Sequence, residues 1–289
     1  MTHVLPTGLL WVVFAGCIGA VAGSFANMVI HRLPRMLEHR WMREASDATG
    51  GTFTDPAPPD LFRPASHCPT CGQALRWWQN IPIVSFIALR GRCAHCQAAI
   101  PTRYLLTELV MTAWFVWCAT YHDPAQATAW FWSVWGACLI TLAIIDWRTF
   151  LLPDPLTLGL LWLSLVAAAL GLLPVSPTQA IWGAAVGYLV VFLPGWVFER
   201  VTGRTGMAHG DFKLMAAVGA AVGPSQVIFT LLAASLLGIA MALFARRWMP
   251  QSSTEGGFDV APGAIPFGPA IAAAAMVLQV WPLDWLALQ

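Results

Sequence analysis

Hydrophobic positions along the chain gather into eight long runs that are separated by shorter polar stretches. An apolar run of about 20 residues is long enough to cross a bilayer as an α-helix. We therefore expect an all-α polytopic membrane protein with about eight transmembrane helices, embedded in a lipid bilayer. The expected segments are residues 9–30, 104–120, 125–145, 156–173, 180–198, 214–222, 227–245 and 265–285.

The sixth segment, residues 214–222, is too short to cross the bilayer unaided. Two explanations are open at this point. The helix could begin inside the polar motif that precedes it, or the segment could be a broken or re-entrant one that is lined by protein.

The positive charges predict which connections face the cytoplasm, because cytoplasmic loops carry an excess of Lys and Arg. With eight crossings, all 15 basic residues fall on one side, which we expect to be cytoplasmic, and both termini fall on the periplasmic side. Without the sixth crossing, Arg246 and Arg247 would fall on the periplasmic side. Nine arginines lie between the first two segments, and the others are Arg148, Arg200, Arg204, Lys213, Arg246 and Arg247.

Composition supports the membrane assignment, since 58% of the residues are hydrophobic and only 10% are charged. The first eight residues contain no Lys or Arg, so the first run is not typical of a secretory signal and is expected to stay in the mature protein. The net charge of +1 gives no reason to expect a nucleic-acid partner.

Two C-x-x-C pairs lie in the polar region between the first two segments: Cys68 with Cys71, and Cys93 with Cys96. Two such turns that face each other supply four thiolates in a tetrahedral arrangement, which favours zinc. Reduced cysteines or disulfides are the alternative, although disulfides are rare in the cytoplasm. Four thiolates leave no open coordination position, so we expect the metal to be structural.

The stretch between the two cysteine pairs is too apolar for a flexible linker and is expected to form the core of a small metal-stapled subdomain. Residues 44–64 are expected to be irregular. The predicted organisation is a first transmembrane helix (1–30), a cytoplasmic zinc-binding loop domain (31–103) and a domain of transmembrane helices (104–289).

Two acidic positions lie at the cytoplasmic ends of predicted spans: Asp146 at the end of the third, and Asp211 at the entry to the sixth. This placement permits a carboxylate pair, in which one ionised member activates water while the other, protonated, polarises a scissile carbonyl. A single aspartate at such a position is commonly an interfacial charge. A helix N-cap is the alternative for Asp154 and Asp211, since each precedes an apolar run.

The chain resembles the type IV prepilin peptidases, a family of bacterial inner-membrane enzymes. The resemblance is carried by the motifs of residues 23–34 (GSFANMVIHRLP), both cysteine pairs, and Arg103-Tyr104 with Glu108. It continues through Ile145-Asp146, Leu152-Pro153-Asp154, Gly210-Asp211-Phe212-Lys213 and Pro266-Phe267-Gly268-Pro269.

The resemblance implies that Asp146 and Asp211 are the catalytic pair of a G-x-G-D type aspartic peptidase. It implies prepilins or pseudopilins, of type IV pilus or type II secretion systems, as substrates, cut after a glycine on the cytoplasmic side. The first glycine of the motif is Ala208 here. Alanine would be strained at that position if the backbone needed a positive φ.

The resemblance also implies S-adenosylmethionine-dependent N-methylation of the new N-terminus, although no nucleotide-binding motif is visible in the sequence. We name Glu38 and Glu108 as candidate residues for this second activity. The alternatives are a surface charge for Glu38 and an interhelical hydrogen bond for Glu108.

Two other classes of protein fit parts of the pattern. A zinc-stapled assembly scaffold without peptidase activity would use both aspartates only to cap helices. A transporter would use intramembrane acids and broken helices as an ion path, but it is expected to place its acids near the bilayer midplane.

Overall fold

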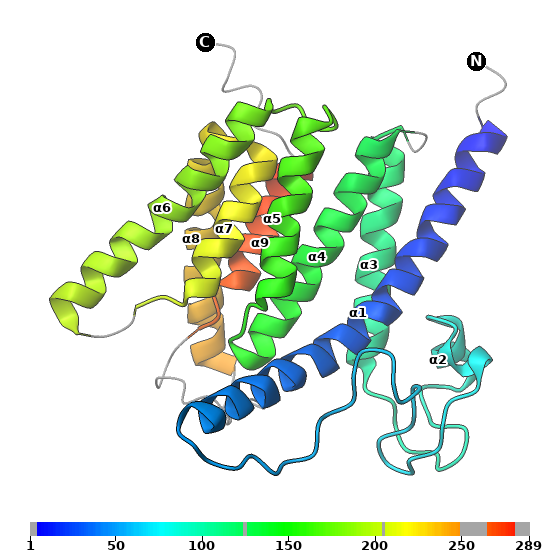
Figure 1. Ribbon diagram of the computed structural model, residues 1–289. Helices are drawn as coiled ribbons and strands as arrows, with labels where there is room; N and C mark the ends of the chain where they lie inside the picture. Colours follow the sequence, from blue (N-terminus) through cyan, green and yellow to red (C-terminus); the bar gives the residue numbers. More distant parts are fainter. Residues whose placement is uncertain (1–4, 124–125, 204–205, 249–264, 281–289) are drawn as a thin grey trace. The chain divides into compact units, whose positions relative to one another are not determined.

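The computed structural model describes residues 5–123, 126–203, 206–248 and 265–280 (Figure 1). These residues form α-helices and one short 3-10 helix, without a β-strand. The expected positions Ala125, Arg204 and Trp285 lie outside the described residues. The helices are α1 (Leu5–Ala48), η1 (Trp77–Asn80), α2 (Val84–Ala88), α3 (Thr102–Tyr121), α4 (Ala127–Thr149), α5 (Asp154–Ala169), α6 (Pro177–Thr202), α7 (His209–Val222), α8 (Pro224–Trp248) and α9 (Gly268–Val280).

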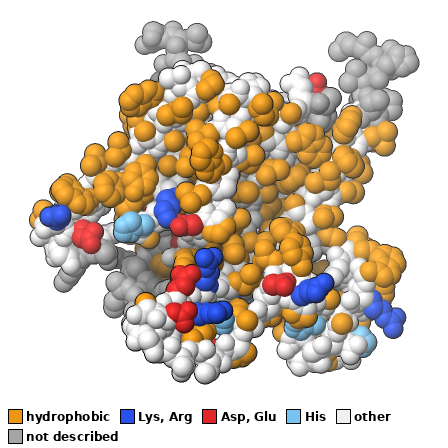
Figure 2. Space-filling view, in the orientation of Figure 1, with side chains coloured by type: hydrophobic (Ala, Val, Ile, Leu, Met, Phe, Trp, Pro, Cys, Tyr) orange, Lys and Arg blue, Asp and Glu red, His pale blue; other side chains and the backbone are white. Residues whose placement is uncertain are grey.

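The predicted all-α membrane fold is confirmed. Within the described ranges, each of the eight apolar segments has its own helix: α1, α3, α4, α5, α6, α7, α8 and α9. Four of these helices, α1, α4, α6 and α8, are long and apolar enough to cross a membrane by length and composition, and α5 and α9 are shorter apolar helices. Large hydrophobic side chains cover much of the visible helical surface (Figure 2), as a lipid-facing surface requires.

The chain divides into two compact units, Met1–Ala137 and Cys138–Gln289, with the boundary inside α4. This division is geometric. The assignment of separate roles to residues 1–30, 31–103 and 104–289 stays a prediction.

The first unit contains α1 and α3, which pack against each other, together with the cysteine loop. Helix α1 does not end where its apolar run ends at Ile30 but continues to Ala48, through residues that we assigned to the loop. Apolar side chains continue in this part, with Leu33 buried, and an i,i+4 pair between Arg40 and Glu44 (2.8 Å) supports the exposed last turns.

In the second unit, α7 lies among α5, α6, α8 and α9 (Figure 1). Its 14 residues reach only about 21 Å, less than the roughly 30 Å of a hydrocarbon core. The helix begins at His209, inside the polar motif, which is the first of the two explanations given for the short sixth segment. Nearly the whole circumference of α7 is buried, so protein and not lipid surrounds this short helix.

The close packing of α6 against α7 depends on two facing glycines. A Cβ atom on Gly183 would collide with the carbonyl oxygen of Gly219, and a Cβ on Gly219 would collide with that of Gly183. Small residues at such crossings allow two membrane helices to approach backbone to backbone. This contact fixes the position of α7, and with it the position of Asp211.

Candidate active site and metal centre

Asp146 lies in the last turn of α4 and is buried, with 5% of its surface exposed. The helix ends at Thr149, and the next residue, Phe150, has a left-handed φ of 54° and an N–H that donates to the Asp146 carbonyl oxygen (2.9 Å). The Asp146 carboxylate accepts a hydrogen bond at Oδ2 from the backbone N–H of Gly268 (2.9 Å). Asp146 therefore contacts the first residue of α9, which is 122 positions later in the chain.

The role of Gly268 was missed in the sequence, although its motif was noted. A Cβ atom at this position would lie 2.7 Å from Oδ2 of Asp146 and 3.2 Å from Cδ2 of Leu152. Only a residue without a side chain lets the backbone N–H approach the carboxylate this closely. A Gly-Pro pair before an apolar run is a helix-start signal, which locates α9 but does not indicate its partner.

Asp211 lies in the first turn of α7 and is also buried, with 5% exposed. Asp146 and Asp211 belong to the same compact unit, and they are close enough for their charges to interact. The sequence-based expectation that these two residues come together is therefore met by the fold.

The residues around Asp211 hold the start of α7 from several sides. Gly210 packs on Leu152, where a Cβ at residue 210 would lie 2.6 Å from the Leu152 Cβ. The Phe212 ring contacts the rings of Tyr188 and Phe192 on α6, at centroid distances of 5.9 and 5.6 Å. Buried Leu152 thus touches both Gly210 and Gly268 and fills the space beside the two carboxylates.

Lys213 and Asp154 form an ion pair at 2.6 Å, which connects the first turns of α7 and α5. The N-cap alternative for the acidic residues is wrong. The N-cap residues are Pro153 for α5 and Ala208 for α7, and neither of these two residues makes a side-chain cap hydrogen bond. Asp154 and Asp211 lie inside their helices.

Ala208 has φ −77° and ψ 144°, an extended conformation that any residue adopts without strain. The replacement of the motif glycine is therefore compatible with the backbone at this position.

The four cysteines of the loop converge in the first unit. Their Sγ atoms all lie within 4.8 Å of one another, and the Sγ atoms of Cys68 and Cys96 are 3.8 Å apart. Sulfur atoms that each lie about 2.3 Å from a tetrahedral zinc ion would be about 3.8 Å apart. No disulfide forms between them. The cluster can hold a metal ion.

Each C-x-x-C pair forms a similar tight turn. The N–H of Gly72 donates to the Cys68 carbonyl, and the N–H of Gln97 donates to the Cys93 carbonyl; both Gly72 and Gln97 have positive φ. Backbone N–H groups of Cys71 and Thr70 also face the Cys68 sulfur and lower the pKa of that thiol to about 6. The turn thus favours the thiolate, which is the form that binds metals.

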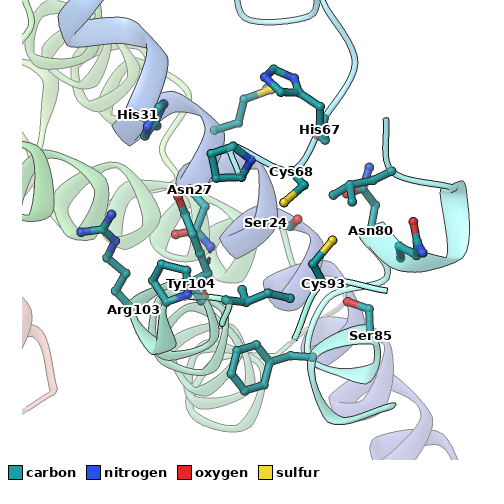
Figure 3. Close-up of a pocket in the computed structure, with 18 of the residues that line it drawn as sticks. Ser24, Asn27, His31, His67, Cys68, Asn80, Ser85, Cys93, Arg103 and Tyr104 are labelled. Atoms are coloured by element: carbon teal, nitrogen blue, oxygen red, sulfur yellow. Dashed lines mark hydrogen bonds between the residues drawn. The ribbon is translucent and has the colours of Figure 1, made fainter. Parts of the chain in front are cut away.

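The two candidate residues for methyl transfer have different surroundings. Glu108 on α3 accepts a hydrogen bond at Oε2 from the backbone N–H of Ile83 (2.7 Å) and a second one from the Ser24 side chain. Glu108 therefore joins α3 to the loop as well as to α1. Glu38 is partly exposed on α1. A cavity of about 490 Å³ lies between α1, the cysteine loop and the start of α3 (Figure 3), and Glu108 lines this cavity whereas Glu38 does not.

Comparisons with known proteins match both parts of the chain. A family model for the bacterial peptidase A24 N-terminal domain matches residues 17–122, and a model for the type IV leader peptidase family matches residues 133–243. No solved structure matches the chain.

Curated relatives match over most of their length. A protein of Pseudomonas aeruginosa is 40% identical over 271 residues, covering 91% of this chain and 88% of the relative. Proteins of Stutzerimonas stutzeri and Aeromonas hydrophila are 39% and 40% identical, covering 94% and 96% of this chain and 91% and 93% of the relatives. All three are named prepilin leader peptidase/N-methyltransferase.

Because family models match residues 17–122 and 133–243, the ranges that contain the four-cysteine cluster and both buried aspartates, and because relatives with about 40% identity cover nearly the whole sequence, the chain belongs to the type IV leader peptidase family.

Proposed function

We propose that this protein is a membrane aspartic endopeptidase that removes the leader peptide of type IV prepilins or type II secretion pseudopilins and then N-methylates the new N-terminus. Asp146 and Asp211 are the catalytic carboxylates. The observation that carries the proposal is the burial of these two aspartates in one unit at interacting distance, with Asp146 oriented by Gly268. The names of the curated relatives support both activities.

Peptide hydrolysis by this pair needs no metal. Two neighbouring carboxylates in a site with little water share a proton and titrate as a unit. The ionised member removes a proton from water as the water oxygen attacks the scissile carbonyl carbon. The protonated member polarises the carbonyl oxygen, and a proton then passes to the leaving amine as the C–N bond breaks.

The positive charges support an orientation with the active site and the cysteine loop at the cytoplasmic face of the bacterial inner membrane, and with both termini periplasmic. Carboxylates at the cytoplasmic face of the membrane can reach a peptide bond that lies just outside the hydrophobic segment of a substrate helix. Cleavage after a glycine at the cytoplasmic end of that segment is consistent with this arrangement. In this scheme residues 104–289 carry the peptidase activity.

The metal in the cysteine cluster is zinc with a structural role. The fit rests on four cysteine sulfur atoms that lie within 4.8 Å of one another, since four thiolate ligands leave no position open for a substrate. The metal would hold the two C-x-x-C turns together in residues 31–103, where regular secondary structure is sparse beyond the end of α1.

Methyl transfer would follow cleavage. When bound, S-adenosylmethionine would supply an electrophilic methyl group to the neutral amine of the new N-terminus, and the amine proton would pass to solvent.

The peptidase proposal is tested with purified full-length protein, a synthetic prepilin and mass spectrometry of the products. Asp146→Asn and Asp211→Asn should each lower the cleavage rate by at least about 100-fold. Asp154→Asn, which changes an exposed carboxylate in the same unit, should lower it less than about tenfold. Cleavage at the wild-type rate by either of the first two variants would favour the scaffold alternative.

A further inference from the structure

The connection between α4 and α5 consists of only four residues, Phe150 to Pro153, and it begins four positions after Asp146. Its first residue has a left-handed φ of 54°, and its last residue is a proline that is the N-cap of α5. Proline fixes its own φ and restricts the residue before it. The course of this connection is therefore tied to the end of the helix that carries Asp146.

Leu152 is a buried side chain of this connection, with 7% of its surface exposed, and it packs on two glycines. A Cβ atom on Gly210 would have three Leu152 atoms as its nearest neighbours outside its own helix, namely Cβ, Cδ1 and Cγ at 2.6, 3.2 and 3.4 Å. A Cβ on Gly268 would lie 3.2 Å from the other methyl group, Cδ2. The leucine thus packs directly on the backbone at the start of both α7 and α9.

Each of these two glycines helps to place one of the carboxylates. Gly210 directly precedes Asp211 in α7, and the N–H of Gly268 donates to Oδ2 of Asp146 (2.9 Å). One methyl group of Leu152 therefore touches the backbone that carries Asp211, and the other touches the backbone that holds Asp146. The leucine side chain lies as a spacer between these two supports.

Close helix packing positions Asp211 rather than Asp146. Among the described helices, α7 packs closely against α5, α6, α8 and α9, and α4 forms none of these close pairs. The ion pair of Lys213 and Asp154 also links the starts of α7 and α5, but its side chains are partly exposed, and such pairs contribute little. The position of Asp146 relative to Asp211 therefore depends on the buried contacts of Leu152 and Gly268.

We propose that Leu152 is a positioning residue that sets the separation of the Asp146 and Asp211 carboxylates. Its side chain holds the start of α7 at a fixed distance from the start of α9, to which the Asp146 carboxylate is bound. Two carboxylates share a proton only when they are a few ångströms apart, and a close-packed interior transmits a change in one side chain to its neighbours. The proposal rests on the proposed peptidase function and adds a residue outside the acid pair.

The first test removes the spacer in the purified full-length protein. Leu152→Ala should lower kcat for leader cleavage by at least about tenfold while KM stays within about threefold, because the two carboxylates act on bound substrate rather than hold it. Leu152→Met, which keeps the side-chain volume, should restore kcat to within about threefold of wild type. The matched control is Leu160→Ala, a buried leucine on α5, which should lose a similar melting temperature but keep its kcat.

The second test widens the same contact from the opposite side. Gly210→Ala adds a carbon atom that meets Leu152, and it should lower kcat by at least about tenfold. Its melting temperature should change little, because alanine forms helices better than glycine does. In a Leu152→Gly background the same exchange should change kcat by less than about twofold, because the atoms that the new carbon would meet are gone.

Three results would overturn the positioning role and leave the peptidase function intact. They are a wild-type kcat in Leu152→Ala, an equal loss of kcat in Leu160→Ala, and a loss from Gly210→Ala that is as large in the Leu152→Gly background as in the wild type. If Leu152→Ala does not fold in detergent, Gly210→Ala decides, and a normal kcat in that variant would overturn the role. Failure of the wild-type protein to cleave any prepilin would instead remove the proposed function itself.

Discussion

The backbone N–H of Gly268 donates a hydrogen bond to the Oδ2 atom of Asp146 at 2.9 Å, and the glycine lacks the side-chain carbon that would otherwise lie 2.7 Å from the same oxygen. The N-terminus of α9 thus approaches the Asp146 carboxylate directly. Helix N-termini attract negative charge, and this contact orients the carboxylate toward the start of α9.

The first prediction concerns this contact. Gly268→Ala should lower leader cleavage by at least about tenfold, because the added Cβ displaces the carboxylate, and a catalytic group that is moved by about 1 Å loses rate steeply. The cleavage rate and the melting temperature are measured together. Gly159→Ala on α5, where a Cβ meets nothing within 4 Å, is the control and should cleave normally. Normal cleavage by Gly268→Ala would contradict the orienting role.

The second prediction concerns Ala208, which stands where the related motif has glycine. Because its φ of −77° suits any residue, Ala208→Gly should leave the cleavage rate within about twofold of wild type. The assay is leader cleavage under conditions of limiting enzyme. A large increase in rate would mean that the alanine restrains the active site.

The third prediction concerns the ion pair of Lys213 and Asp154, whose side chains are 32% and 55% exposed. Exposed pairs contribute about 0–1 kcal/mol. Lys213→Ala should therefore lower the free energy of unfolding by no more than about 1 kcal/mol, with a small loss of cleavage. Denaturant titration in detergent measures the free energy of unfolding. The reversed pair, with Lys213→Asp and Asp154→Lys combined, should recover part of the loss if the interaction is electrostatic.

The fourth prediction concerns the metal. Elemental analysis should find about one zinc ion per chain, and Cys68→Ser or Cys96→Ser should lower that content. Within the cluster, the pKa of Cys68 is lowered to about 6 by backbone N–H groups, whereas the pKa of Cys96 is raised to about 11 by desolvation and by the neighbouring sulfur atoms. Zinc must displace the protons of such thiols, so zinc uptake by metal-stripped protein should weaken progressively as the pH is lowered. Unchanged metal content in the serine variants would show that the ion binds elsewhere.

The sequence alone predicted the eight apolar helices of this protein, because a membrane helix is defined by an apolar run that local composition reveals. It also predicted the cysteine cluster, since the C-x-x-C spacing places two sulfurs on one turn. The two aspartates were identified by their motifs and by their place at segment ends. The extension of α1 to Ala48 was missed because a helix that leaves the membrane no longer needs apolar residues.

Only the tertiary structure decided which distant residues meet. The bond from Gly268 to Asp146, the bond from Ile83 to Glu108 and the pair of Lys213 with Asp154 join residues 122, 25 and 59 positions apart. The cavity beside the cysteines likewise depends on the packing of α1 and α3 against the loop. Local pattern determines which segments are helical, whereas such contacts depend on how the helices pack against one another, and a single sequence does not state that packing.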